Sequence, residues 1–162
     1  MNGWTWNVPA LGQTAERSRL VTARDIELFT ELSGDYNPLH YDEEVAAATI
    51  FGGIIVQGGV GSAILNAVVA EELPGPGSVF LELNLRFAAP IRPGDVITGS
   101  AEVTSVRSDK PITGLTVRVT RDDGVVAVEG TAVCFTFALP PPYRRRRPGY
   151  CPMRSLVPDT KV

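Results

Sequence analysis

The chain has 162 residues, of which 44% are hydrophobic and 20% are charged. This length and composition are typical of one globular domain that buries a core without metals or disulfides. The net charge of −3 argues against nucleic-acid binding. Two cysteines and one histidine exclude a disulfide scaffold, a Cys-rich zinc site and a His-pair metal site within this chain.

The start of the chain has no lysine or arginine before Arg17 and no continuous apolar stretch. It therefore does not resemble a signal peptide, and we expect a cytoplasmic protein. Residues 45–70 carry no charge and are long enough to cross a bilayer. Five glycines between Gly52 and Gly61 would make a poor membrane helix. We predict no membrane span here, but a loop followed by a helix that is buried on nearly all sides.

The first half of the chain predicts a candidate strand at residues 14–21, followed by helices. A capping-box-like start at Thr22 and apolar residues at helical spacing predict a short helix from Ala23 to about Leu32. Gly34 suits the left-handed cap that ends such a helix. Ser33 to Tyr41 then reads as a loop.

Two more helices are predicted before the strands begin. Asp42 can cap a short helix from Glu43 to about Thr49. A longer one is expected from Gly58 or Gly59 to Leu73, where the Pro-Gly-Pro-Gly sequence at 74–77 ends it.

The second half of the chain alternates with a period of two, which is typical of strands. The expected strands are Val79–Phe87, Val96–Arg107, Ile112–Arg121 and Val125–Phe137. Helices followed by antiparallel strands indicate an α+β fold. An antiparallel sheet wrapped around one charge-free, buried central helix is the hot-dog fold, which we predict for residues 1–139.

Residues 140–162 differ in composition from the predicted domain. They begin with three prolines and include the run Arg144–Arg147. We predict an irregular or disordered tail, because prolines cannot continue a strand. The arginines are expected to be solvated rather than bound to phosphate in a chain of net negative charge.

The only histidine of the chain, His40, follows Asp35 by five residues in the predicted loop. Histidine titrates near neutral pH and suits proton transfer, and a neighbouring carboxylate can orient it or share its water. The alternative is that Asp35 forms an Asx turn and that His40 is an ordinary surface side chain.

The predicted central helix begins at Gly58 or Gly59 and is preceded by Gln57. A helix N-terminus presents free N–H groups that can bind a developing oxyanion, and glycines let a ligand approach them. The alternative is that the glycines only allow the helix to pack tightly on the sheet.

The segment F-T-E-L-S-G-D-Y-N-P-L-H-Y-D, from Phe29, resembles the signature of the MaoC-like hydratases, the (R)-specific enoyl-CoA hydratase family. The run F-G-G-I-I-V-Q-G from Phe51 and the R-P-G-D turn from Arg92 are similar to further parts of that family. The resemblance covers about residues 10–138. It implies a hot-dog fold, a homodimer or larger assembly, a role in fatty acid metabolism, and an acyl-CoA substrate.

The resemblance implies that the chain adds water to trans-2-enoyl-CoA to give (R)-3-hydroxyacyl-CoA. Asp35 and His40 match the catalytic pair of the family, and Asn37 matches the asparagine that helps to hold the loop. Gly58 matches the glycine whose N–H meets the thioester oxygen. No metal or redox cofactor is implied, because the CoA belongs to the substrate.

The chain departs from the family pattern at two positions. Gln57 stands where the family often has His, so hydrogen bonding beside the oxyanion site is expected to differ. Asn66 stands where some members carry a small polar residue, which we expect to alter how Asp35 is oriented.

Other questions stay open from the sequence. Which member of the catalytic pair is the base is not decided by the sequence, although Asp35 as base and His40 as assisting donor is favoured. Arg86, Arg107 and Lys110 are candidate contacts for the CoA phosphates, each with the alternative of a plain surface charge. The acyl chain length is also open. Two rival functions are a hot-dog acyl-CoA thioesterase and a non-catalytic acyl-binding or scaffold domain.

Overall fold

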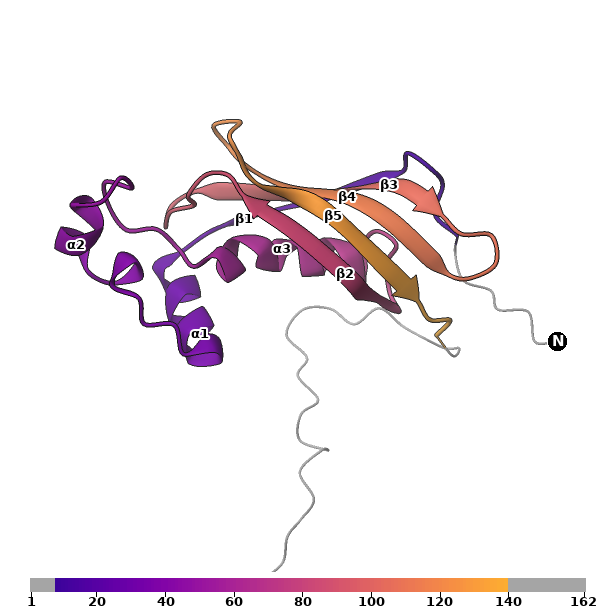
Figure 1. Cartoon of the computed structure of the whole chain (residues 1–162), viewed down its shortest axis with the longest axis horizontal. Helices are drawn as coiled ribbons and strands as arrows, with labels where there is room; N and C mark the ends of the chain where they lie inside the picture. The colour runs from indigo at the N-terminus through magenta and orange to yellow at the C-terminus, as the bar shows by residue number, and fades with distance from the viewer. Residues whose placement is uncertain (1–7, 140–162) are drawn as a thin grey trace, which may run out of the picture.

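The computed structural model describes residues 8–139, and the predicted tail lies outside them. One five-stranded antiparallel sheet has the strand order β1-β3-β4-β5-β2. Figure 1 shows α3 lying across one face of this sheet, with α1 and α2 beyond one of its ends. The prediction of an α+β hot-dog architecture is confirmed. The strands are β1 (Thr14–Leu20), β2 (Ser78–Phe87), β3 (Val96–Val106), β4 (Ile112–Arg121) and β5 (Val126–Thr136).

The first helix, α1 (Ala23–Ser33), begins and ends as the sequence predicts. The Asp25 carboxylate accepts a hydrogen bond from the Thr22 N–H at 2.7 Å and completes a capping box. Gly34 ends the helix at a φ of 76°, a left-handed conformation that glycine adopts without steric cost. This cap turns the chain directly into the loop that carries Asp35.

Two short helical segments follow this loop. The loop contains one 3₁₀ turn, η1 (Pro38–His40), which the sequence analysis did not predict. The helix α2 (Glu43–Ala47) begins where the Asp42 carboxylate accepts a hydrogen bond from the Val45 N–H at 3.0 Å. It ends two residues before the expected Thr49.

The central helix α3 (Gly58–Glu71) packs its apolar side into the curve of the sheet. Its contact with β3 is close, because a Cβ atom on Gly99 would lie 2.7 Å from Ile64 Cγ2. The prediction of burial on nearly all sides is wrong for the single chain. Ala63, Asn66 and Ala70 are exposed on the face turned away from the sheet. Small uncharged side chains therefore do not by themselves distinguish a buried helix face from one left open.

The edge strand β2 departs from the period of two that its sequence suggests. Its register against β5 shifts between Phe80 and Glu82, so Leu81 is a bulge residue. The shift lets Phe80 pack against the core on the same side as Leu85. Val79 and Leu81 are left 46% and 54% exposed. The continuous alternation predicted from Val79 to Phe87 is thus wrong before Glu82, because one extra residue reverses the side-chain direction.

The Asp25 carboxylate yields a stability prediction. Burial raises the pKa of this carboxyl group, but hydrogen bonds from the Thr22 N–H and from Arg19 lower it by more. The pKa of Asp25 therefore lies below its ordinary value. Such a group stabilises the fold above its ordinary pKa, and this stabilisation is lost as the pH falls through the folded-state pKa. Asp25→Ala should therefore cost about 1–2 kcal/mol at pH 7, measured by urea unfolding, and progressively less in acid. Glu31→Ala, on an exposed part of the same helix, should cost under about 0.5 kcal/mol.

Candidate active site

The loop between α1 and η1 is held by hydrogen bonds from its own side chains. Asn37 adopts φ −56° and ψ 130°, the extended geometry that the following Pro38 favours. Its side-chain Oδ1 accepts from the Leu39 N–H at 3.1 Å, and its own N–H donates to Asp35 Oδ1 at 3.1 Å. One carboxylate oxygen of Asp35 is therefore fixed by the backbone, and the other is free to face His40.

The His40 ring is oriented by a backbone carbonyl. Its Nδ1 lies 2.8 Å from the Ile55 carbonyl oxygen, and because a carbonyl only accepts, Nδ1 must carry a proton. Nε2 then faces Asp35, with 3.5 Å between Nε2 and Oδ2. The side chain of His40 is 8% exposed and that of Asp35 is 39% exposed. The pair thus opens to solvent on the carboxylate side.

A neutral His40 with its proton on Nδ1 has an acceptor at Nε2, and the carboxylate of Asp35 is also an acceptor. Two acceptors 3.5 Å apart do not bond to each other, but one water molecule can donate one O–H to each. The geometry is suited to holding a water with its oxygen lone pairs directed away from the pair.

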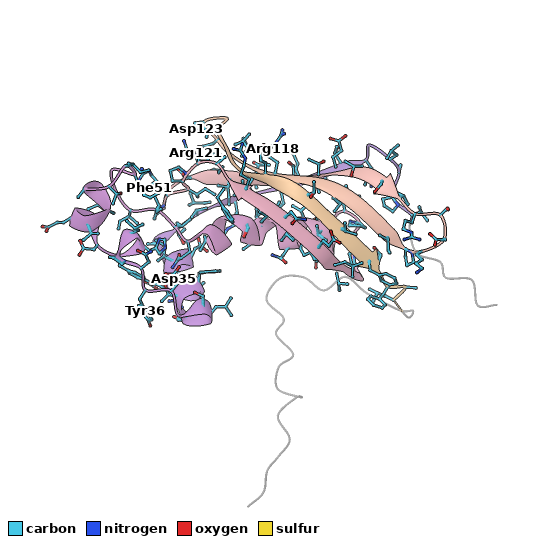
Figure 2. All side chains as sticks on the ribbon, in the orientation of Figure 1. Asp35, Tyr36, Phe51, Arg118, Arg121 and Asp123 are labelled. Atoms are coloured by element: carbon cyan, nitrogen blue, oxygen red, sulfur yellow. The ribbon has the colours of Figure 1, made fainter. Side chains whose placement is uncertain are left out.

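Figure 2 shows Asp35 and the neighbouring Tyr36 at the helical end of the molecule, on the side of the sheet opposite Arg118.

The segment from Phe51 to Gln57 joins the His40 turn to the start of α3. The Ile55 N–H donates to the Leu39 carbonyl at 3.3 Å, and the Ile55 carbonyl accepts from His40 Nδ1. Two hydrogen bonds therefore join this segment to the His40 turn. The Arg92 guanidinium donates to the carbonyls of Phe51 and Ile54. This arginine belongs to the R-P-G-D turn, which the sequence analysis treated only as a turn and a family feature.

Gly58 occupies the first position of α3, where the N–H has no intrahelical partner. Its backbone is not left-handed, so the glycine provides space rather than an unusual φ. A Cβ atom there would lie 3.0 Å from the ring of Phe87. An open path to the N–H of Gly58 thus requires the absence of a side chain.

A cavity of about 350 Å³ lies beside Gly58. Its walls are mostly apolar and include Phe51, Ile55, Gly61, Phe87 and Ile91. Ile55 is common to both parts of the site, since it lines this cavity and its carbonyl holds His40. The cavity can therefore accept an apolar group whose polar end lies near the helix start.

Of the predicted site residues, Asp35, Asn37 and His40 lie together, and Gly58 follows the segment that holds His40. Asn66 is not brought to them: it lies on the exposed face of α3, eight residues or about 12 Å of helix beyond Gly58. Its predicted influence on Asp35 has no contact to support it among the described residues.

Two of the candidate phosphate contacts already have acidic partners. Arg86 pairs with Glu129 across β2 and β5, and Arg107 pairs with Asp109 in the β3–β4 turn. An Arg with a bound carboxylate has less free charge to offer a phosphate. Residues 8–139 contain no group of three or more His, Cys, Asp or Glu side chains that could hold a metal ion. None of the helices in that range is long and apolar enough to cross a membrane.

Comparison with known proteins finds a matching family model and similar curated proteins. Residues 7–125 match the family model described as "MaoC like domain". An (R)-specific enoyl-CoA hydratase of Aeromonas caviae is 41% identical over 123 residues, which are 76% of this chain and 92% of that protein.

Two solved structures have the same fold. The structure of the A. caviae (R)-hydratase has a TM-score of 0.75 at 39% identity, covering 79% of this chain and 97% of that one. An R-hydratase of Pseudomonas aeruginosa, unliganded, also has a TM-score of 0.75, at 34% identity, covering 81% and 84% of the two chains.

Proposed function

Because the chain belongs to the MaoC-like domain family, we propose that it adds water to the double bond of a trans-2-enoyl-CoA and catalyses the reverse dehydration. The chain is an enzyme of the hydro-lyase class, and the expected product is the (R)-3-hydroxyacyl-CoA. The observation that carries the proposal is the 3.5 Å separation of Asp35 Oδ2 and His40 Nε2, next to a segment that leads into a free helix N-terminus.

Activation of water is the first requirement of the reaction. Water is a poor nucleophile, and a base must remove a proton as its oxygen attacks C3. A water that donates to both Asp35 and His40 presents its lone pairs to the substrate. Asp35 takes one proton from this water, and the new C–O bond forms at C3.

Stabilisation of the thioester oxygen is the second requirement. As the C–O bond forms, the π electrons move toward the thioester and place negative charge on its oxygen. We assign its stabilisation to the N–H of Gly58 and the positive end of the α3 dipole, because Gly58 is the first residue of this helix. The acyl chain then enters the apolar cavity beside Gly58.

Proton delivery to C2 completes the addition. The proton that Asp35 took from the water passes across the 3.5 Å gap to the unprotonated Nε2 of His40, which then delivers it to C2 and returns to its neutral form. One water is consumed, one O–H bond of that water and the C=C π bond break, one C–O and one C–H bond form, and there is no net oxidation or reduction. The reaction needs no redox cofactor. We further propose that the protein is cytoplasmic and acts in fatty acid metabolism.

The direct test is incubation of the purified protein with crotonyl-CoA and longer trans-2-enoyl-CoAs. Loss of the enoyl absorbance with formation of the (R)-3-hydroxyacyl product supports the proposal. Release of free CoA thiol would instead identify a thioesterase, and binding of enoyl-CoA without turnover would identify an acyl-binding domain. The comparison of chain lengths also measures the depth of the acyl cavity.

The catalytic pair is tested by Asp35→Asn and His40→Gln. Each change keeps the size of the side chain and removes its proton-transfer capacity, so kcat should fall by about 10²–10⁴-fold in each variant. Asp109→Asn is the matched control, since its carboxylate lies in the exposed β3–β4 turn. Near-normal turnover in either site variant, with intact circular dichroism, would reject the assignment.

The oxyanion position is tested by Gly58→Ala. Gly58 is the first residue of α3 rather than an interior one, and its new methyl group meets the Phe87 ring, so the stability of the variant should change by less than the ~1 kcal/mol that separates alanine from glycine in helix interiors. Its methyl group would crowd the N–H and the Phe87 ring, and the hydration rate should fall by about 10²-fold. Ala70→Gly, in the exposed last turn of α3, should lower the melting temperature and keep activity. A fully active Gly58→Ala protein would place the thioester elsewhere.

We also propose that the chain forms a closed two-fold homodimer through β2 and the open face of α3. β2 is an edge of the sheet, and its exposed residues include Val79, Leu81 and Phe87. An apolar edge strand is usually covered in native proteins, and two-fold symmetry is the commonest way for identical chains to do so.

The dimer is tested by light scattering at micromolar concentration. The wild type should have twice the 17.4 kDa mass of the chain, and Leu81→Glu should shift it toward the monomer. Val125→Glu, at an exposed position beside the β4–β5 turn, should not. A wild-type mass of one chain contradicts the proposal.

A further inference from the structure

The hydroxyl group of Thr30 lies where three segments of the site meet. It donates to the Asp35 carbonyl at 2.8 Å, and it accepts from Gln57 Nε2 at 3.0 Å and from the Tyr41 hydroxyl. Thr30 itself belongs to α1, Asp35 and Tyr41 flank the His40 turn, and Gln57 immediately precedes Gly58. One buried oxygen atom therefore connects the segment that carries the acid–base pair to the start of α3.

The directions of these hydrogen bonds are fixed by their partners. The second N–H of the Gln57 amide donates to the Ile26 carbonyl at 3.3 Å, which only accepts, so the nitrogen must face α1. The Asp35 carbonyl also only accepts, so the single hydroxyl proton of Thr30 points to it. The Thr30 oxygen then accepts from both Tyr41 and Gln57, which fills its capacity of one donor and two acceptors.

Burial makes this junction difficult to replace by water. Thr30 is 4% exposed and Gln57 is 2% exposed. Gln57 Oε1 has no hydrogen-bond partner among the described residues, so this amide contributes to the fold through its two N–H donors alone. Two donors directed at the Thr30 oxygen polarise its O–H and strengthen the bond to the Asp35 carbonyl.

We propose that Thr30 is a positioning residue that sets the distance between the Asp35–His40 pair and the N–H of Gly58. The inference rests on the proposed hydratase function, in which one substrate must meet the water at C3 and the helix N-terminus at its thioester oxygen. A displacement of about 1 Å between two such groups can lower a rate by about 10²-fold. Thr30 acts through the backbone of Asp35 and through Gln57, without touching the substrate.

The decisive experiment compares Thr30→Val with Thr30→Ser. Valine keeps the shape of threonine and removes the hydroxyl, so with crotonyl-CoA kcat should fall by about 10–100-fold while KM changes by less than about threefold. Serine keeps the hydroxyl and should restore most of kcat. Thr113→Val is the matched control, because Thr113 is fully buried in β4 and its hydroxyl has no partner among the described residues.

A second readout does not depend on turnover. The chain has one histidine, so the imidazole nitrogen signals in a ¹⁵N NMR spectrum belong to His40 alone. Thr30→Val should shift these signals, whereas Thr30→Ser and Thr113→Val should leave them close to wild type. This readout keeps the two proposals separate, since a wild type that fails to hydrate enoyl-CoA rejects the function but still reports the coupling of Thr30 to His40.

The following results would overturn the proposal. Unchanged kcat and unchanged His40 signals in a folded Thr30→Val protein overturn the proposal, as does an equal loss of kcat in Thr113→Val. If Thr30→Val does not fold, Tyr41→Phe replaces it, because it removes one of the two donors to the Thr30 oxygen and leaves the bond to Asp35. It should lower kcat by about two- to fivefold and shift the His40 signals in the same sense. No change in either measurement overturns the proposal.

Discussion

The close contact of α3 with the sheet determines where the rest of the site can lie. The helix has no charged residue before Glu71, and its buried side chains fill the curve of β3, β4 and β5. Gly99 lets Ile64 approach the β3 backbone. Because the position of the helix is fixed by this packing, the position of its N-terminus is fixed as well. The partial positive charge at Gly58 is therefore held in place without any charged side chain.

Backbone groups provide most of the contacts that orient the proposed acid–base pair. The Ile55 carbonyl sets the proton of His40 on Nδ1 and leaves Nε2 to face Asp35. The Asp35 carboxylate accepts a hydrogen bond from the N–H of Asn37. The backbone carbonyl of Asp35 accepts one from the Thr30 hydroxyl. The Thr30 hydroxyl is thus the one side-chain partner among these three contacts, and the other two are made by backbone groups.

The open surfaces of the single chain have a common character. The outer face of the sheet carries ion pairs and hydroxyls, whereas β2 and the outer side of α3 present apolar or small uncharged side chains. Burial of the latter surfaces in a second copy would be favourable, since each buried Å² of apolar area contributes about 25 cal/mol. Such burial would also bring the cavity beside Phe87 close to the partner, because Phe87 ends β2.

Local sequence determined most of the secondary structure, because each element has a start and stop signal of its own. The capping box at Thr22, the left-handed Gly34 and the restriction of Asn37 by Pro38 depend on neighbours within a few residues. The hot-dog architecture was also predictable, since a charge-free helix before four alternating strands has few other ways to bury its side chains. The signature loop predicted Asp35 and His40 as the candidate catalytic pair by motif alone.

Only the tertiary structure decided how these parts meet. The Leu81 bulge depends on the register of β2 against β5, and neither strand encodes it alone. Asn66 lies away from Asp35, because helix rotation on the sheet rather than residue type decides which side of α3 is open. Thr30, Tyr41 and Gln57 are far apart in sequence and share one buried oxygen only after α1 docks beside the start of α3. Contacts between distant segments follow from packing, which no local pattern records.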